Sequence, residues 1–525
     1  SQWGYDLVLR VKPDDPNVVF IGAVAMYRSN DAFKTNKFTI IGGICPFDEC
    51  DYQWRYPNHH ADLHQIIFSR NNPNVLYTGS DGGVHKSIDA MADIQNWISL
   101  NNGYFTTQFY ALGIDHEDTK NEMVIGGLQD NGTLLSLKNE MKKEWNNPTR
   151  GDGFFCQIPN GGAYVISSQN STPQPKISIW RTILNEDGSN LIQTRIDPIG
   201  GKDFIWNTPF VLDPNETNRM YLAGGKMVWR NNDIMQIPLI NSKDSTSINW
   251  DSLNHTRIDF IVGDTRSEHI SAIQVSTKPA NVLYYGTTRG RLYRIDDAHI
   301  GNPKPIEITG KYFPKAAYIG SIAIDPDDAS NVTVSFTNYG IMSIFNSKDA
   351  GLNWTAISGN LEERPDGTGV GPGVKWIEIL KIKDKKLYYA GTTAGLFSTA
   401  FINGESTVWK QEGATTIGNV PVDMIDARHE DGYVAVGTHG AGIFQAYVNE
   451  LPQLPEKTSL VSPINQTKNL KEKANLVWNV EQTAGVYEVQ ISMDPDFNKI
   501  DTIIGGLKGT TVEISGLKQG FVNYY

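Results

Sequence analysis

The sequence is poor in positive charge and has no long apolar run. Lys and Arg number 46 against 58 Asp and Glu, so the 525 residues carry a formal net charge of −12. This balance argues against a nucleic-acid groove or a polybasic membrane surface, because both need an excess of Lys and Arg. No apolar run approaches the roughly 20 residues that cross a bilayer. The sequence therefore predicts neither a nucleic-acid partner nor a membrane span.

Cysteine is also scarce, with three residues in the chain. Three are too few for a disulfide scaffold, and a zinc site needs about four ligands. Cys45 and Cys50 bracket a loop-like spacer, so they form either a short-range disulfide in an oxidising compartment or two ordinary thiols. Cys156 is expected in the core rather than as a nucleophile. The chain lacks the G-x-S-x-G, H-E-x-x-H and P-loop motifs, and we predict no cofactor.

Apolar and aromatic residues are plentiful at 39% and 10%, which excludes disorder over most of the chain. A unit recurs in which a β-branched or aromatic strand ends on glycine before a polar turn. Its clear copies lie at residues 17–22, 74–79, 122–126, 219–224, 281–286, 331–336, 386–391 and 433–437, with a weaker copy at 163–167.

The spacing of these copies predicts the fold class. About eight steps separate Gly22 from Gly437, a period near 50 residues that is typical of a four-stranded propeller blade. An inner strand precedes the repeated unit, as at 271–275 and 321–325, and an outer strand with Trp follows it, as at 96–98 and 353–355. We therefore predict an all-β protein in which residues 1–450 form a β-propeller of about eight blades, with seven to nine allowed.

One hairpin has a recognisable local pattern. Residues 347–354 follow S-x-D-x-G-x-x-W and resemble the Asp-box of BNR-type propellers. We expect Asp349 to accept backbone N–H groups, Gly351 to supply a positive φ and Trp354 to pack between blades. A looser version runs from Ser87 to Trp97. This is a structural device, and Asp349 is not expected to be catalytic.

The repeat stops near Ala446. A proline-spaced linker at 451–457 leads to a small all-β pattern at 458–525, with strands expected at 476–478, 486–492, 511–514 and from 521. Its early Trp and later Tyr-rich strand resemble a fibronectin type III sandwich. The pattern is short for that fold, so we expect the domain to be incomplete at its C-terminus. At the other end, either a signal peptide has been removed or the start is missing.

A His-rich stretch precedes an early strand. His60, Asp62 and His64 alternate, so within a strand they would share one face, with His59 beside them. Imidazole and carboxylate groups on one face suit a metal ion, a bound ligand or a polar network that fixes the strand. The sequence leaves these three alternatives open, and no metal is assigned.

Three acidic turns follow at blade-like spacing. They hold Asp81, then Gln129, Asp130 and Asn131, then Asp152. If they occupy equivalent turns of successive blades, they converge on one mouth of the central channel. Asp-Gly and Asn-Gly are also favoured hairpin turns that need no ligand. The candidate ligand-binding residues are His59, His60, Asp62, His64, Asp81, Gln129, Asp130, Asn131 and Asp152, and we assign no catalytic residue.

The ordered series of motifs from residue 59 to residue 153 resembles one group of proteins. These are the secreted BNR and sortilin-like propellers, related in pattern to xyloglucanase-type glycoside hydrolases. The group is common among Bacteroidota proteins exported by the type IX secretion system. The resemblance implies secretion or display at the cell surface, and the type IX machinery as a partner during export.

Three functions remain open at this point. The first is non-catalytic binding or adhesion to a glycan or surface protein, which nearby aromatic residues would suit if they do not pack between blades (Trp3, Trp54, Tyr56, Tyr104, Phe105 and Tyr110). The second is a glycoside hydrolase with a carboxylate pair at the channel mouth. The third is a role mainly as secretion cargo. Sialidase activity is not expected, because residues 195–197, 257–259 and 294–296 read R-I-D and no R-I-P start occurs.

Overall fold

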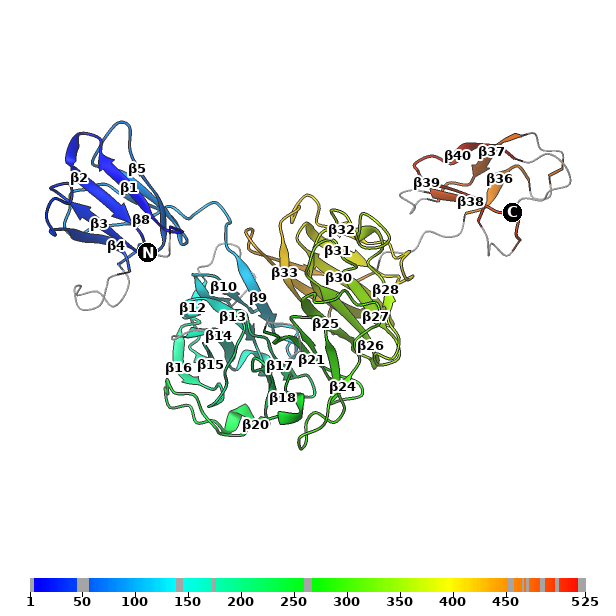
Figure 1. The fold of residues 1–525 in the computed structure, drawn as a ribbon, viewed down its shortest axis with the longest axis horizontal. Coiled ribbons are helices and arrows are strands. Elements are labelled where there is room, and N and C mark those ends of the chain that lie inside the picture. The colour runs from blue at the N-terminus through cyan, green and yellow to red at the C-terminus, as the bar shows by residue number, and fades with distance from the viewer. Residues whose placement is uncertain are drawn as a thin grey trace. The chain divides into compact units, whose positions relative to one another are not determined.

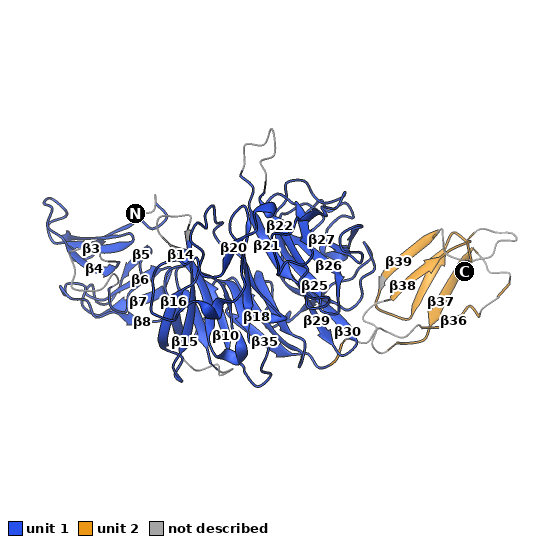
Figure 2. Cartoon of the chain, turned by 90° about the horizontal axis from the view of Figure 1, so that it is seen from below, with its two compact units in different colours: residues 1–449 blue, residues 450–525 orange. Residues whose placement is uncertain are grey.

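The computed structural model describes residues 4–44, 56–137, 145–171, 176–258, 267–451, 458–464, 467–468, 472–481, 487–495 and 500–517. Regular structure in these ranges is β-strand, apart from four short 3-10 turns at Asn160–Gly162, Ile234–Gln236, Asn254–Thr256 and Gly359–Leu361. Among the described residues, no helix has the length and apolar character to cross a membrane. The chain divides into two compact units, residues 1–449 and residues 450–525 (Figure 2).

Nine antiparallel sheets make up the first unit, and strands that are adjacent in sequence are neighbours in each sheet. The first two sheets contain Val8–Lys12 (β1), Asp15–Gly22 (β2), Ala25–Ser29 (β3) and Thr39–Gly43 (β4), then Leu63–Phe68 (β5), Leu76–Ser80 (β6), Gly83–Ser87 (β7) and Ile98–Ser99 (β8). We call these eight strands the sheet pair.

The next three sheets contain Phe109–Ile114 (β9), Val124–Leu128 (β10), Gly132–Ser136 (β11) and Asn146–Thr149 (β12); Gly153–Gln157 (β13), Val165–Ser171 (β14), Lys176–Leu184 (β15) and Asn190–Arg195 (β16); Phe210–Asp213 (β17), Glu216–Ala223 (β18), Val228–Asn231 (β19) and Trp250–Ser252 (β20).

The last four sheets of this unit contain Ile270–Val275 (β21), Leu283–Thr287 (β22), Leu292–Ile295 (β23) and Ile306–Glu307 (β24); Ile319–Asp325 (β25), Asp328–Phe336 (β26), Ile344–Ser347 (β27) and Thr355–Ala356 (β28); Val374–Ile382 (β29), Lys385–Thr392 (β30), Gly395–Thr399 (β31) and Lys410–Glu412 (β32); Val422–Arg428 (β33), Tyr433–Thr438 (β34) and Ile443–Tyr447 (β35).

Seven of the nine sheets close into a propeller. Strand β9 packs against β33 and β34, so the sheets from β9–β12 to β33–β35 form a ring (Figure 1). A buried cluster seals the closure, with Leu112 and Ile114 on one side and Tyr433 and Ala435 on the other. Closure gives each sheet of the ring a neighbour on both faces and leaves only short, protected strand edges. We call this part the seven-sheet ring.

The sheet pair lies outside that ring, and its two sheets pack on each other through Phe20, Met26, Leu63, Ile66 and Leu76. The predicted β-propeller is therefore confirmed, and its seven blades fall within the predicted range. The assumption that all of residues 1–450 belong to one ring is wrong. Every repeat folds into a sheet, but the contacts between sheet faces decide which sheets close.

The sequence repeat itself marks the same place in every sheet. All nine copies, the weak one included, fall on the second strand of a sheet (β2, β6, β10, β14, β18, β22, β26, β30 and β34). The inner strands expected at 271–275 and 321–325 are β21 and β25. The outer strands expected at 96–98 and 353–355 overlap β8 and β28 by one residue each, and Trp97 and Trp354 lie just before those strands. Apolar alternation therefore located the strands correctly.

Tryptophan and arginine side chains form hydrogen bonds between successive sheets. Each of four Trp indoles donates to a backbone carbonyl of the preceding sheet region over 2.7–2.9 Å (Trp97 to Ile41, Trp250 to Ile196, Trp354 to Ile308 and Trp409 to Ile357). In the other direction, an Arg on a third strand donates to an Ala carbonyl of the following sheet (Arg28 to Ala90, Arg230 to Ala298 and Arg294 to Ala350). These bonds satisfy buried polar groups that apolar packing alone would leave unpaired.

The Asp-box pattern folds as predicted. Asp349 accepts the backbone N–H of Asn353 at 2.8 Å, Gly351 has φ +90°, and Trp354 packs on Phe313. The same turn occurs at Ser29–Thr35, where Asp31 accepts the N–H of Thr35. There Phe33 takes the place of the glycine with φ 54°. The sequence pattern missed this turn because it lacks both the glycine and the tryptophan.

The second unit has two small sheets. One contains Leu460–Ser462 (β36), Lys473–Trp478 (β37) and Thr511–Ser515 (β40), and the other contains Tyr487–Ile491 (β38) and Thr502–Leu507 (β39). Ala474, Ile491 and Ile514 form its core. Strands were expected over three of these segments, whereas β36 and β39 were not anticipated. The linker was expected at 451–457; its residues 452–457, and the strand expected from 521, lie outside the described residues.

Candidate functional site

Asp62 stands immediately before strand β5 in a left-handed conformation with φ 59°. Strand β5 begins at Leu63, so His60 and Asp62 precede it and only His64 belongs to it. The expectation that His60, Asp62 and His64 share one face of a strand is therefore wrong, since a residue with φ near +60° cannot continue a strand.

Asp81 occupies the turn between β6 and β7. His64 Nε2 lies 2.6 Å from its Oδ1, and the Tyr5 hydroxyl donates to Oδ2 at 3.1 Å. Gly82 follows, and a Cβ there would lie 2.2 Å from the ring of His60. The glycine is thus needed for the turn to approach the His60 side chain.

Asp130 occupies the corresponding turn between β10 and β11, also with positive φ, at 60°. Its backbone N–H donates to Asp152 Oδ1 at 2.9 Å. The Asn170 amide donates to the other oxygen of Asp152, which fixes that carboxylate from a second side. Two acidic residues of this site therefore hold left-handed backbone conformations that L-residues adopt uncommonly, a kind of strain that is concentrated at functional sites.

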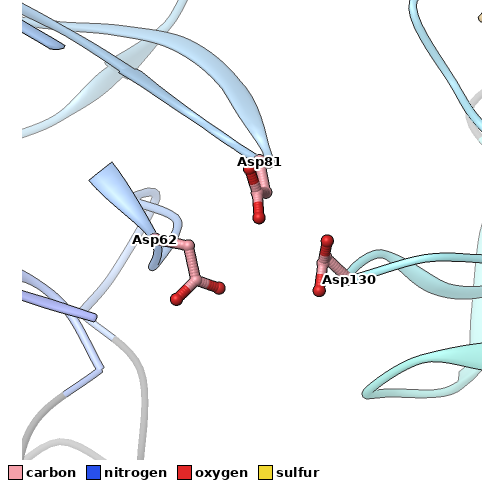
Figure 3. A group of neighbouring side chains, drawn as sticks. All are labelled: Asp62, Asp81 and Asp130. Carbon is pink, nitrogen blue, oxygen red and sulfur yellow. The ribbon is translucent and has the colours of Figure 1, made fainter. Parts of the chain in front are cut away.

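The carboxylates of Asp62, Asp81 and Asp130 meet, with one oxygen from each lying within 4.8 Å of the others (Figure 3). Asp62 and Asp81 come from the sheet pair, whereas Asp130 comes from the seven-sheet ring. Two hydrogen bonds of 3.1 Å cross the same junction: His60 Nε2 contacts the Asp130 carbonyl, and the Asn131 amide donates to the Asp81 carbonyl. The site therefore forms where the two bodies touch.

Electrostatics at this junction are dominated by negative charge. Partial burial, followed by the neighbouring carboxylates of Asp152 and Asp81, raises the pKa of Asp130 to about 8. Burial, together with Asp81, raises the pKa of Tyr5 to about 12. At neutral pH Asp130 is therefore protonated, which lets its carboxyl group share hydrogen bonds with acidic neighbours.

The donor set is one that a hard cation prefers. Calcium takes carboxylate and amide oxygens, and Asp62, Asp81 and Asp130 would supply three carboxylates. A cavity of about 80 Å³ adjoins them, lined by Tyr5, Gln108, Gln129 and Asn131 among others. A space of this size accommodates an ion with water molecules, but it is small beside the 300–1,000 Å³ typical of ligand pockets.

His59 does not join the other candidates. Its Nδ1 accepts the N–H of Gly43, its Nε2 contacts the Thr78 hydroxyl, and its ring stacks on Trp97 at 3.9 Å. Burial lowers the pKa of His59 to about 2, with a further contribution from His85 and His60. It is a neutral core residue that connects β4, β6 and the segment just before β8 in the sheet pair.

The three acidic turns do meet, but not as successive blades at one channel mouth. Asp81 and Asp130 each occupy the turn between the second and third strands of a sheet. The sheet of Asp81 belongs to the sheet pair, whereas that of Asp130 belongs to the seven-sheet ring. Asp152 precedes an inner strand, β13, instead of occupying such a turn. The expected arrangement assumed one continuous ring. It is wrong because the sheet pair ends at β8 and a separate ring begins at β9.

Sequence reasoning missed Tyr5 and Asn170, which carry no motif and reach the site only through tertiary contacts. Of the aromatic candidates, Tyr56 packs in the core of the sheet pair, whereas Tyr104 and Phe105 are exposed. The hydroxyl of Tyr110 donates to Gln129. Trp3 and Trp54 lie outside the described residues.

The cysteine expectations have separate outcomes. Cys156 is buried in the core between β9–β12 and β13–β16, and burial raises the pKa of its thiol, so its expected core role is confirmed. Cys45 and Cys50 lie outside the described residues.

No protein family and no curated protein matches the sequence. Among solved structures, the GH74 enzyme of Niastella koreensis is similar with a TM-score of 0.47 and 13% identity, over 83% of this chain and 59% of that one. YCF48 from Cyanidioschyzon merolae is similar with a TM-score of 0.41 and 12% identity, over 65% of this chain and 96% of that one. The chain thus spans about 59% of the GH74 enzyme's length. At such identities and TM-scores these likenesses say nothing of the activity of this chain.

Proposed function

We propose that this protein is a secreted, non-catalytic binding protein that engages a glycan or surface protein at the junction of the sheet pair and the seven-sheet ring. The observation that carries the proposal is the meeting of Asp62, Asp81 and Asp130 from three separate segments. Carboxyl groups from the two bodies are held so close together that the pKa of Asp130 is raised to about 8, and such an arrangement is maintained more readily when it has a ligand.

Geometry favours binding over hydrolysis. Oxygens of Asp62, Asp81 and Asp130 meet within 4.8 Å of one another, whereas a retaining glycosidase holds its two carboxyl groups about 5–5.5 Å apart on either side of the scissile bond. The adjoining cavity of about 80 Å³ is also too small to enclose a sugar ring in a substrate position. A partner would therefore contact the rim of the site, with an ion or a single polar group in the cavity.

A glycoside hydrolase remains the second candidate because of one observation. Asp130 has a pKa of about 8, so it would be protonated at neutral pH as a general acid must be. Hydrolysis would require the sheet pair and the ring to separate enough to admit a sugar chain, with Asp81 or Asp152 as the second carboxylate.

A glycan-array and polysaccharide-hydrolysis screen tests both candidates. It compares the wild type, the triple variant Asp81→Asn/Asp130→Asn/Asp152→Asn, and Asp244→Asn, an exposed acidic residue on the ring that serves as the control. Binding without released sugar, lost only in the triple variant, supports the binding function. Released sugar that the triple variant abolishes supports the hydrolase, and a triple variant equal to the wild type places any activity elsewhere.

We further propose the export route and domain roles. Residues 1–450 would act as the binding part, 451–457 as a linker, and 458–525 as a fibronectin type III-like spacer, in a protein carried by the type IX secretion system. An epitope-tagged full-length protein should then reach the medium or the cell surface of a type IX-competent Bacteroidota strain. Equal export from a strain that lacks the secretion machinery would refute this route.

A further inference from the structure

The sheet β1–β4 has an apolar face that no described residue covers. Leu7, Leu9 and Val11 alternate along β1 and its approach, and they are 61%, 56% and 45% exposed. Arg10 lies on the alternate face, where its Nε donates to the Ile66 carbonyl of β5. Because alternate residues of a strand point to opposite faces, the Leu7, Leu9 and Val11 side chains point away from β5. Phe38, exposed beside Tyr27, extends this surface, which we call the front face.

The sheet β5–β8 has a second open face. Ile66 is buried against β1–β4, whereas the next residue, Ile67, is exposed on the other side. Val84 and Ile98, on β7 and β8, are exposed as well. This surface, the back face, lies on the side of β5–β8 opposite β1–β4. Exposed apolar side chains gathered on one face of a sheet are typical of association surfaces in soluble proteins.

The hydrogen bonds from Arg side chains to Ala carbonyls of the following sheet indicate what kind of surface would cover the front face. Ala90, Ala298 and Ala350 each receive an Arg from the preceding sheet. Ala32 holds the equivalent turn, since its N–H donates to the Asn17 carbonyl as that of Ala90 does to Asn74. Among the described residues, no arginine bonds the Ala32 carbonyl. A sheet covering the front face would need a cation on its third strand.

The back face supplies such a cation. Lys86 on β7 pairs with Tyr77 of β6, and in the first sheet Arg28 on β3 pairs with Phe20 of β2. Lys86 therefore holds the position in its sheet from which Arg28 donates to the following sheet. Its Nζ lies 5.8 Å from the ring centroid of Tyr77, on the same sheet. The chain therefore carries both halves of one more sheet-to-sheet contact.

We propose that the front face of one copy of this chain packs on the back face of a second copy, with Lys86 of one donating to the Ala32 carbonyl of the other. This contact is independent of the ligand site proposed above. Because it joins different surfaces, it is heterologous and continues until the ring closes. Propellers close with about four to eight sheets, so two to four copies would complete a second ring from their sheet pairs.

Multi-angle light scattering and sedimentation velocity on the full chain test the proposal. The wild type should form an assembly of two to four copies, and Leu9→Glu should reduce it to monomers. The matched control is Leu191→Glu, at an equally exposed leucine on β16 of the seven-sheet ring, and it should leave the assembly intact. Lys86→Met, which removes the donor but keeps the length of the side chain, should weaken association by about three- to tenfold, the effect of losing one hydrogen bond.

Equal melting temperatures and circular dichroism for the variants would establish that they fold. A wild type that is monomeric at about 0.1 mM, where a contact of even modest affinity would be populated, overturns the proposal. That outcome would assign the front face to a sheet from another polypeptide or from a longer form of this one. An assembly that survives Leu9→Glu overturns it as well, because the front face would then lie outside the contact.

Discussion

The side-chain amide of Asn131 donates a 3.1 Å hydrogen bond to the backbone carbonyl of Asp81. This bond connects a turn of the seven-sheet ring to a turn of the sheet pair. It places the Asp130 carboxyl group, next in sequence to Asn131, beside the carboxylates of Asp81 and Asp62. The candidate site is therefore a property of the docked arrangement, and neither body contains it alone.

Replacing Asp130 with asparagine should stabilise the protein at alkaline pH. Its pKa rises from 3.8 to about 8 on folding, so the folded state holds the proton more tightly and stability falls as pH rises from about 4 to about 8. Asp130→Asn removes this titration, and we expect a gain of about 1 kcal/mol at pH 9 after allowance for solvent screening. Calorimetry between pH 5 and pH 9 measures it. Asp244→Asn is the control, and an equal gain in both variants would contradict the argument.

Calcium should stabilise the wild type at pH 8 more than it stabilises Asp130→Asn. A divalent cation offsets the repulsion among Asp62, Asp81 and Asp130, and it binds the folded state because the unfolded chain does not hold these groups together. We expect a rise of a few degrees in the melting temperature at millimolar calcium, measured by differential scanning fluorimetry. Identical shifts in both proteins would show that the ion binds elsewhere.

His59 should make the protein sensitive to acid. Its pKa is about 2 in the folded state and 6.5 ordinarily, so the unfolded state binds the proton more tightly and stability falls as pH drops below about 6.5. His59→Gln should lose about 1–2 kcal/mol at pH 7, because the Trp97 stacking and hydrogen bonds weaken, but it should lose less on acidification. Urea unfolding at pH 7 and pH 5 gives both values. Ligand binding should not change in His59→Gln. If a folded variant lost ligand binding, His59 would have to be counted among the ligand-binding residues.

Arg28 should stabilise the sheet pair and not the ring. It is buried and donates to the carbonyls of Ala90 and Ala92 at 3.1 and 2.8 Å. Arg28→Met should cost about 2–4 kcal/mol, because it leaves buried carbonyl groups without donors. Hydrogen exchange should quicken in β1–β8 and stay unchanged in β9–β35. Arg294→Met, which removes the corresponding hydrogen bond in the ring, should give the reverse pattern.

Much of the fold could be predicted from local sequence. The repeated strand, which ends on glycine in seven of its nine copies, located the second strand of all nine sheets, and Ser347–Trp354 predicted the geometry of its own turn. These features depend on alternation, turn residues and hydrogen bonds between near neighbours, which the sequence encodes directly. The motifs around Asp81, Asp130 and Asp152 were likewise visible as acidic turns.

The sequence alone thus determined that this protein is built of propeller sheets, and which residues occupy their turns. Only the tertiary structure decided that seven sheets close while two stand apart, that Asp62 and Asp81 meet Asp130 across that break, and that His59 turns into the core. The physical reason is that one sheet repeat looks like another in sequence. Closure depends on which faces meet, and Leu112 packs on Tyr433 over a separation that no local pattern records.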